Sequence, residues 1–272
     1  MADTTSQQPK LYIYDFCPFS CRARVALGLK KVKYNVIFMA FNDVATPTSL
    51  VGTKAAPIFV PVGESPFTES WDVVSYVDKH YGDSPIIKEA SGREDLAKWI
   101  ESAMPSLNVL YNPRLYAAPL PEFTLRASRE FFKTKREASI SFSEALAKTP
   151  DLVQKVNQLL LELEPMLYSN HSVNEELSYD DLDLFGRLRA LTLVKGIEWP
   201  TKVREFMNFI SETGDVPMFD AVVKIYRNVC CIYPNVILLV CSLTVLLTKK
   251  FMKSSLSVGL EQSVIPRLEH YR

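Results

Sequence analysis

The stretch that decides the fold is Cys17-Pro18-Phe19-Ser20-Cys21, which lies between an apolar strand-like run at 11–15 and a helical pattern over 18–30. Proline suits the first helical position, because its missing N–H needs no partner there. At such a strand-to-helix junction, unpaired backbone N–H groups converge and the helix dipole favours negative charge. The stretch therefore predicts that Cys17 is a nucleophile whose thiol has a lowered pKa. A buried structural cysteine is the alternative interpretation.

Further elements follow this junction in a regular order. Apolar runs and turn signals predict two more strands at 34–40 and 58–60, a short helix within 42–51 and a fourth strand after the turn at 64–68. Residues 69–81 have helical periodicity, with Val73, Val74 and Val77 on one face. This βαβ then ββα order predicts an α/β domain over 11–83, with a thioredoxin-like sheet and helices on both faces. Residues 1–10 are expected to be a flexible leader.

The second half of the chain has a different pattern. Glycine, proline and serine clusters predict a linker over 84–92. Beyond it we expect an all-helical domain over 93–221, with helices at 93–111, 122–147, 151–168, 178–195 and 200–213. Ser178 and Asp181 have the spacing of a capping box, and Leu177 and Leu182 that of a hydrophobic staple, so a core helix is expected to begin there.

Charge and cysteine content exclude several classes of protein. Lysine plus arginine and aspartate plus glutamate both number 31, so the zero net charge gives no electrostatic case for a nucleic-acid partner. The five cysteines (17, 21, 230, 231 and 241) do not form a secreted disulfide framework. No histidine lies near either cysteine group, so no metal site is expected. Because 1–10 holds no signal peptide, we expect a reducing compartment, the cytoplasm.

An extension at 222–272 contains an apolar segment, 229–248, without a charged residue. Twenty such residues are about enough to span a bilayer, and basic residues on both sides leave the orientation open. Pro234 and Asn235 weaken the first turn of such a span. The segment fits a membrane anchor, an added element packed on the helical domain, or a tail without a folded role.

Several motifs occur together, in one order, in both halves of the chain. They are Leu11-Tyr12-Ile13-Tyr14-Asp15, Cys17-Pro18, Thr46-Pro47-Thr48, Val51-Gly52, Lys54, Pro57-Ile58, Glu69-Ser70, Tyr76-Val77-Asp78-Lys79, Glu176-Leu177-Ser178, Asp180-Asp181, Leu184-Phe185, Leu191-Thr192-Leu193-Val194 and Trp199-Pro200. Through them, from about 10 to about 220, the chain resembles the glutaredoxin 2 family, glutaredoxins built like a glutathione transferase.

The resemblance implies that glutathione is the cosubstrate. Cys17 would then form a mixed disulfide with glutathione, and Phe19 would belong to the glutathione site. Pro57 matches the family's cis-proline, which leaves the backbone of Ala56 free to pair with the glutathione peptide. The partners implied are glutathione and glutathionylated or disulfide-containing substrates.

Three further residues are implied in binding the two ends of glutathione. Glu69 and Ser70 match the pair that holds the γ-glutamyl end, at a helix start where N–H groups bind a carboxylate. Lys54 is the candidate partner of the other carboxylate. Alternatively, Glu69 and Ser70 only cap a helix and Lys54 is a solvated surface charge.

The active-site motif departs from the family's Cys-Pro-Tyr-Cys, because Phe19 and Ser20 precede a displaced Cys21. One residue further along a helix turns the side chain by about 100°, so Cys21 points away from Cys17. Cys21 is the candidate resolving cysteine, and without it the enzyme would be monothiol, with a second glutathione resolving the intermediate. Cys-Pro-Phe-Ser is also similar to the site of omega-class glutathione transferases and chloride intracellular channel proteins.

Two functions follow from these observations. The first is glutathione-dependent thiol–disulfide exchange through Cys17, with an omega-like transferase or dehydroascorbate reductase activity as a variant on the same site. The second is a membrane-associated protein of low turnover, suggested by 229–248.

Tyr111, Arg114 and Tyr116 are candidates to face the cleft and meet the second substrate, with core or surface positions as the alternative. We favour a monomer over the dimer common among glutathione transferases.

Overall fold

A computed structural model describes residues 7–220. Its N-terminal part contains a four-stranded mixed sheet in the order β2-β1-β3-β4. The strands are β1 (Lys10–Ile13), β2 (Asn35–Phe38), β3 (Ile58–Val60) and β4 (Phe67–Thr68). β1 runs parallel to β2 and antiparallel to β3, and β3 runs antiparallel to β4. The predicted thioredoxin-like fold is confirmed, although β1 already begins at Lys10, inside the expected leader.

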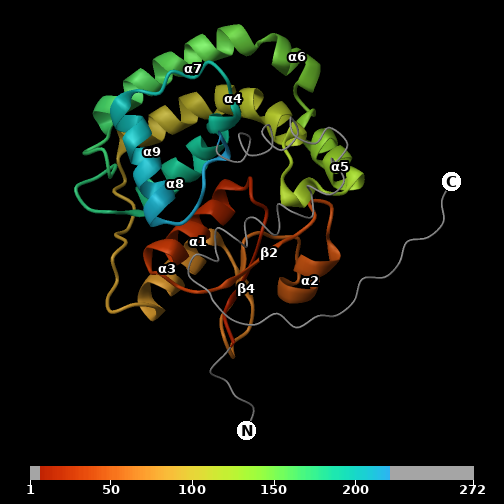
Figure 1. Ribbon diagram of the computed structural model, residues 1–272, viewed down its shortest axis with the longest axis vertical. Helices are drawn as coiled ribbons and strands as arrows, with labels where there is room; N and C mark the ends of the chain where they lie inside the picture. Colours follow the sequence, from red (N-terminus) through yellow and green to blue (C-terminus); the bar gives the residue numbers. More distant parts are fainter. Residues whose placement is uncertain (1–6, 221–272) are drawn as a thin grey trace, which may run out of the picture. The chain divides into compact units, whose positions relative to one another are not determined.

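Three helices accompany the sheet: α1 (Pro18–Leu29), α2 (Ala45–Val51) and α3 (Ser70–His80). α1 packs against α3, whereas α2 lies against β3 and β4 (Figure 1). The predicted inner face of α3, Val73, Val74 and Val77, is completely buried. Gly52 ends α2 with φ of 77°, a left-handed conformation that glycine adopts without a steric cost.

The second part of the described chain is helical, as predicted. Its helices are α4 (Glu94–Ala117), α5 (Arg126–Arg136), α6 (Phe142–Ala147), α7 (Thr149–Leu163), α8 (Tyr179–Arg189) and α9 (Thr201–Thr213), with short 3₁₀ turns η2 (Pro121–Phe123), η3 (Glu164–Met166) and η4 (Ala190–Leu193). The single helix predicted over 122–147 is wrong, because the chain breaks between α5 and α6. There the Glu137 carboxylate accepts the Phe142 N–H at 2.6 Å, and the Ser141 hydroxyl accepts the Glu144 N–H at 3.2 Å. These side chains satisfy the start of a new helix.

The expected capping box at the start of α8 is confirmed. Asp181 accepts the N–H of Ser178 at 2.7 Å, and its other oxygen accepts the N–H of Val173, also at 2.7 Å. Leu182 is fully buried, and Leu177 packs against the core. The motif therefore both starts α8 and attaches the preceding loop to it.

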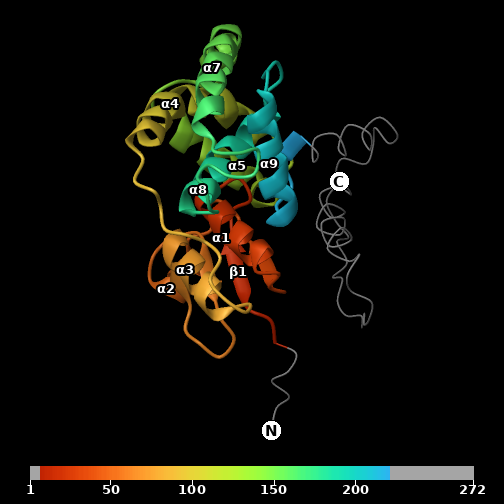
Figure 2. The same cartoon turned by 90° about the vertical axis from the view of Figure 1, so that its left-hand side faces the viewer.

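α1 also contacts α8 and α9, so it lies between the sheet domain and the helical domain (Figure 2). A buried cluster of charges lies at this junction. Arg189 of α8 donates to the Asp15 backbone oxygen at 2.6 Å and to its carboxylate at 2.9 Å, while Arg24 of α1 donates to the same carboxylate at 2.6 Å. The aromatic rings of Trp71 and Tyr179 stack across the junction, with centroids 4.6 Å apart. The turn that carries Cys17 is thus fixed from both domains.

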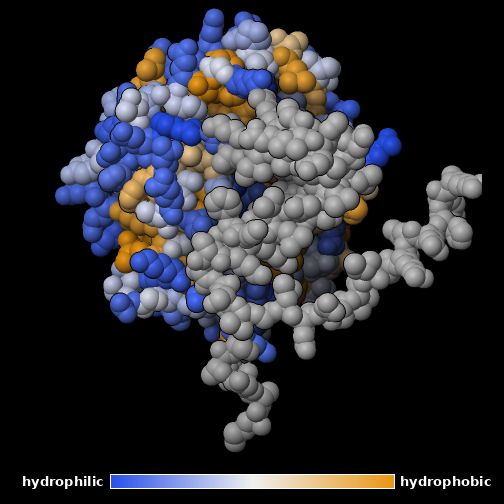
Figure 3. Space-filling view, viewed as in Figure 1, coloured by the Kyte–Doolittle hydropathy of each residue, from blue (hydrophilic) through white to orange (hydrophobic). Residues whose placement is uncertain are grey.

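The surface drawn in colour in Figure 3 is mostly hydrophilic, with separate apolar patches. Within residues 7–220, no helix combines the length and the hydropathy that crossing a membrane requires. The predicted extension over 222–272, its apolar segment 229–248 and the three interpretations of that segment lie outside the described residues, as do residues 1–6.

Candidate functional site

A cavity of about 400 Å³ lies between the β1–α1 turn and the helical domain. The sheet domain and the helical domain both contribute to its wall. Its lining residues are Tyr14, Phe16, Cys17, Pro18, Phe19, Phe41, Lys54, Ala55, Ala56, Met104, Asn108, Tyr111, Asn112, Leu115, Arg136, Gly186, Arg187 and Ala190. Four of the residues expected at the site (Cys17, Phe19, Lys54 and Ala56) therefore share one cavity.

Cys17 is the N-cap of α1, with Pro18 in the first turn as predicted. Its N–H donates to the Tyr14 oxygen at 3.1 Å, and its own oxygen accepts the Cys21 N–H at 2.9 Å. Cys17 is half-buried and lines the cavity, whereas Cys21 is only 1% exposed and is not among the lining residues. This agrees with the expectation that the two side chains point in different directions.

The predicted lowering of the Cys17 pKa is wrong for this structure, because burial raises the pKa of the thiol. Hydrogen bonds from Ser20 and from the Phe19 backbone act in the expected direction and lower it, but they are outweighed. The buried Ser20 hydroxyl has no close hydrogen-bond partner among the described residues, so we regard its effect on the sulfur as weak. The charge of Glu122 raises the pKa further. Helix position alone does not determine the ionisation of this cysteine.

Glu122 was not among the residues expected at the site. It is completely buried in η2, where its carboxylate accepts the Phe16 N–H at 2.9 Å. Its backbone oxygen accepts the Phe41 N–H at 3.1 Å. Burial, together with the nearby charge of Asp15, raises the pKa of Glu122 to about 7. A carboxyl that titrates near neutrality therefore lies next to the Cys17 turn.

Lys54 and Ala56 lie on the sheet-domain side of the cavity. The Lys54 ammonium donates to the Phe41 oxygen at 2.6 Å and lies 4.4 Å from the centre of the Phe131 ring. Burial lowers its pKa. Lys54 is therefore not the freely solvated surface charge of the alternative interpretation. The Ala56–Pro57 peptide bond is cis, as the resemblance implied.

Glu69 and Ser70 are not among the residues that line the cavity. Glu69 is the N-cap of α3 with φ of 76°, a conformation that is strained for a non-glycine residue and common at functional sites. The Ser70 hydroxyl accepts a hydrogen bond from Arg22 at 3.1 Å. The Arg22 guanidinium in turn lies 4.7 Å from the centre of the Phe19 ring. One side chain therefore connects Ser70 with the edge of the cavity.

Of the three residues expected to meet a second substrate, only Tyr111 lines the cavity. Arg114 instead donates to the Leu110 oxygen at 2.5 Å and to the Thr149 hydroxyl at 3.1 Å, and Tyr116 donates to Glu130 at 3.1 Å. For these two residues the alternative, a position outside the cavity lining, holds. Sequence reasoning also missed four polar lining residues of the helical domain: Asn108, Asn112, Arg136 and Arg187. The repeat of 104, 108, 111, 112 and 115 on one face of α4 was a usable signal for the first two.

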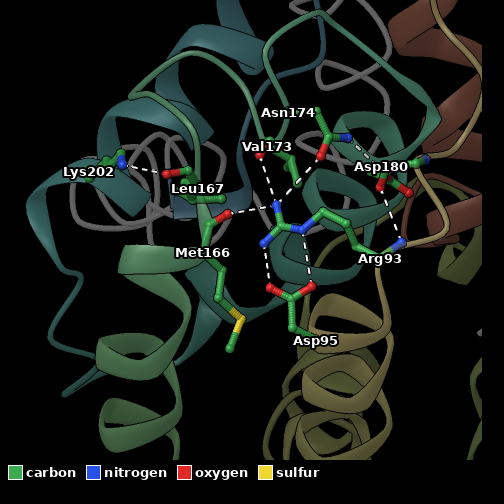
Figure 4. Close-up of polar contacts among 9 residues, drawn as sticks. Arg93, Asp95, Met166, Leu167, Val173, Asn174, Asp180 and Lys202 are labelled. Atoms are coloured by element: carbon green, nitrogen blue, oxygen red, sulfur yellow. Dashed lines mark hydrogen bonds and ion pairs between the residues drawn. The ribbon is translucent and has the colours of Figure 1, made fainter.

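A second hollow, of about 520 Å³, lies around Arg93 and Lys202. Figure 4 shows the polar contacts of these two residues. Arg93 pairs with the Asp95 carboxylate at 2.6 Å and donates to the Met166 oxygen at 2.9 Å and the Val173 oxygen at 3.2 Å. Lys202 donates to the Leu167 oxygen. Both cations bind backbone carbonyls of η3 and of the loop that follows it, so we regard this cluster as structural.

Comparisons with known proteins agree with this geometry. A family model described as Glutaredoxin 2, C terminal domain, matches residues 95–223, and one described as Glutathione S-transferase, N-terminal domain, matches residues 11–85. Glutaredoxin 2 of Escherichia coli (strain K12) is 34% identical over 215 residues, which are 78% of this chain and 98% of the relative.

Comparisons with solved structures agree with the sequence comparisons. Glutaredoxin 2 from Salmonella typhimurium, in complex with glutathione, is 35% identical with a TM-score of 0.76, over 79% of this chain and 99% of that one. A glutathione S-transferase of Ceriporiopsis subvermispora is 17% identical with a TM-score of 0.60, over 78% of this chain and 99% of that one, and shares the fold.

Proposed function

The chain belongs to the glutaredoxin 2 family, and we propose that it is a glutathione-dependent thiol–disulfide oxidoreductase that acts through Cys17. One observation carries the proposal: Cys17 is the N-cap of α1 and opens into the cavity that Lys54 and Ala56 also line. The glutathione complex of the Salmonella relative, 35% identical, supports glutathione as cosubstrate.

In the first half-reaction, the Cys17 thiolate attacks the glutathione sulfur of a glutathionylated substrate. The Cys17–glutathione disulfide forms, and the substrate leaves as a thiolate that takes up a proton. Phe19 and the Ala56 backbone hold the glutathione peptide, with Pro57 shaping the turn. Lys54 pairs with one glutathione carboxylate, and Glu69 and Ser70 with its γ-glutamyl end at the start of α3.

In the second half-reaction, the thiolate of another glutathione attacks the glutathione sulfur of the mixed disulfide. Glutathione disulfide is released and Cys17 leaves as a thiolate, so oxidation and reduction balance. The burial of Cys21 supports this monothiol route, because a resolving cysteine must reach the mixed disulfide. Cys21 would take part only after the first turns of α1 rearranged.

The test compares Cys17→Ser with Cys21→Ser in glutathione-coupled reduction of a glutathionylated peptide. We expect Cys17→Ser to abolish turnover and Cys21→Ser to retain most of it. Peptide mapping after exposure to glutathione disulfide should find glutathione on Cys17. Full activity of Cys17→Ser would refute the proposal, and a Cys17–Cys21 disulfide would replace the monothiol route with a dithiol one.

A transferase or dehydroascorbate reductase activity at Cys17 is the second candidate. Ser20 in place of the family's second cysteine favours it, as does the polar wall that the helical domain adds to the cavity. Assays with dehydroascorbate and with aromatic electrophiles separate these activities from disulfide exchange.

We also propose the cytoplasm as the location and a monomer as the working form. A reducing compartment suits a catalytic thiol. The domain bounds proposed with this function are 11–83 for glutathione binding and 93–221 for the helical domain.

A further inference from the structure

The lining of the Cys17 cavity is positively charged. Three lining residues carry charge, Lys54, Arg136 and Arg187, and all three are cationic. None of the cavity-lining residues that the structure describes is acidic. Lys54 belongs to the sheet domain, where the first glutathione is proposed to bind, whereas Arg136 ends α5 and Arg187 lies in α8.

Both arginines line the same cavity as Tyr111. The Tyr111 hydroxyl donates to the Asn108 side chain at 2.6 Å, and the Tyr111 side chain is largely buried. Arg136 and Arg187 both lie near enough to lower the pKa of Tyr111 against the effect of its burial, which raises that pKa to about 12. Three helices thus bring two guanidinium groups and two polar side chains to one part of the wall.

The positive charge of Arg187 is not cancelled by its ion-pair partner. Asp183 accepts from Arg187 Nε at 2.8 Å, but it also pairs with Arg22, so one carboxylate serves two guanidinium groups. The bond to Nε orients the Arg187 side chain. Arg136 is exposed, and its guanidinium lies 5.5 Å from the centre of the Phe132 ring. Guanidinium groups suit carboxylates because they offer two parallel N–H donors.

We propose that Arg136 and Arg187 bind a carboxylate of the thiol that resolves the Cys17–glutathione disulfide, so that the second half-reaction selects anionic thiols. The inference rests on the proposed function, since it concerns that step. The thiolate sulfur bonds to the glutathione sulfur, the Cys17 sulfur leaves with the electron pair, and a disulfide is released. The attacking thiol enters the space that the helical wall bounds, where its carboxylate meets the two arginines.

The test measures the second half-reaction directly on the full chain. The Cys17–glutathione adduct is prepared and isolated, and its loss is followed by mass spectrometry with 3-mercaptopropionate, 2-mercaptoethanol or cysteamine. Each thiol is compared only between protein variants, so that its intrinsic reactivity cancels. Arg136→Ala and Arg136→Ala/Arg187→Gln are the test variants. Arg126→Ala is the matched control, because it removes one exposed cation from the same helix outside the cavity lining.

We expect the double variant to react with 3-mercaptopropionate at least about tenfold more slowly, because it loses charge-assisted hydrogen bonds to the carboxylate. Its rate with 2-mercaptoethanol should stay unchanged and its rate with cationic cysteamine should rise. Arg136→Ala should show the same pattern, smaller, and Arg126→Ala none of it.

An equal loss of rate with all three thiols would overturn the inference and indicate a structural role for the arginines. Unchanged rates with 3-mercaptopropionate would overturn it as well. Neither result affects the proposed function, whereas failure of Cys17 to form the adduct would overturn both the proposed function and this inference.

Discussion

At Cys17, two local influences oppose each other. The start of α1 offers N–H groups to a thiolate, while burial and the charge of Glu122 favour the neutral thiol. Glu122 itself titrates near pH 7, because it is buried and close to Asp15. The charge of Glu122 therefore changes in the pH range where the enzyme is expected to work, and its protonation favours the Cys17 thiolate.

Replacing Glu122 with glutamine should lower the pKa of Cys17, because it removes a negative charge that opposes thiolate formation. The glutamine oxygen still accepts the Phe16 N–H, so the turn is retained. The measurement is the rate of iodoacetamide alkylation at Cys17 between pH 5 and 10, read by peptide mass. Exposed Glu101, changed to glutamine, is the control. An unchanged alkylation profile in the Glu122 variant would contradict the argument.

Glu122 should also make the stability of the protein depend on pH. Its pKa rises from the usual value of 4.5 to about 7 in the folded state, so folding favours the protonated form. The free energy of unfolding is thus unaffected by this group below pH 4.5 and falls between pH 4.5 and 7, by up to about 3 kcal/mol. Glu122→Gln should therefore gain stability relative to wild type from pH 5 to pH 8. Urea unfolding at both pH values tests this, and a difference independent of pH would speak against it.

At the scale of elements, the site depends on how closely α8 approaches α1. A Cβ atom on Gly186 would lie 2.8 Å from the Pro18 backbone oxygen, next to Cys17. Only glycine permits this distance, because the Pro18 oxygen belongs to the backbone and cannot move aside as a flexible side chain could. The same close approach brings Gly186 and Arg187 into the cavity wall.

Gly186→Ala should therefore push α8 away from the Cys17 turn. We expect a loss of about 1–3 kcal/mol in the free energy of unfolding, typical of overpacking a buried contact. Turnover at a temperature where the variant is fully folded should also fall, because the helical wall moves relative to Cys17. Urea unfolding and the glutathione-coupled assay measure the two effects separately. Normal stability together with normal turnover would show that the contact relaxes without consequence.

At the scale of the whole described molecule, the two domains share a buried charged cluster. Arg189, 2% exposed, binds Asp15 and donates to the Pro217 oxygen at 2.9 Å. Burial opposes the ionisation of Asp15, but Arg189 and Arg24 outweigh it and hold its pKa below the usual range. Asp15 therefore contributes stability above its ordinary pKa, and this contribution is lost as the pH falls. A cluster of this kind connects the folding of one domain to that of the other.

Arg189→Met should destabilise the protein by about 3–5 kcal/mol, because it leaves the buried Asp15 carboxylate with one partner fewer. Adding Asp15→Leu should not recover the loss, because it leaves the buried Arg24 guanidinium without its carboxylate partner. Tryptophan fluorescence, with Trp71 in α3 and Trp99 in α4, and circular dichroism should follow one common transition in wild type. Two separate transitions in wild type would mean that the domains fold independently.

Much of this architecture could be predicted from local patterns. The strand before Cys17, Pro18 in the first turn of α1 and the Ser178–Asp181 capping box depend on residues within a few positions of one another. The break between α5 and α6 was missed, because it depends on the side chains of Glu137 and Ser141 and not on a proline or glycine signal.

The sequence by itself determined the order of the elements, the position of the proposed nucleophile and the resemblance that implies glutathione, because each of these depends on residues that are close together in the sequence. Only the tertiary structure decided the ionisation of Cys17 and the charge of the cavity wall. Glu122 and Phe16 are 106 residues apart in the sequence, and Arg136 and Arg187 come from different helices. Burial and electrostatic effects depend on distance in space, so they appear only when the two domains are packed together.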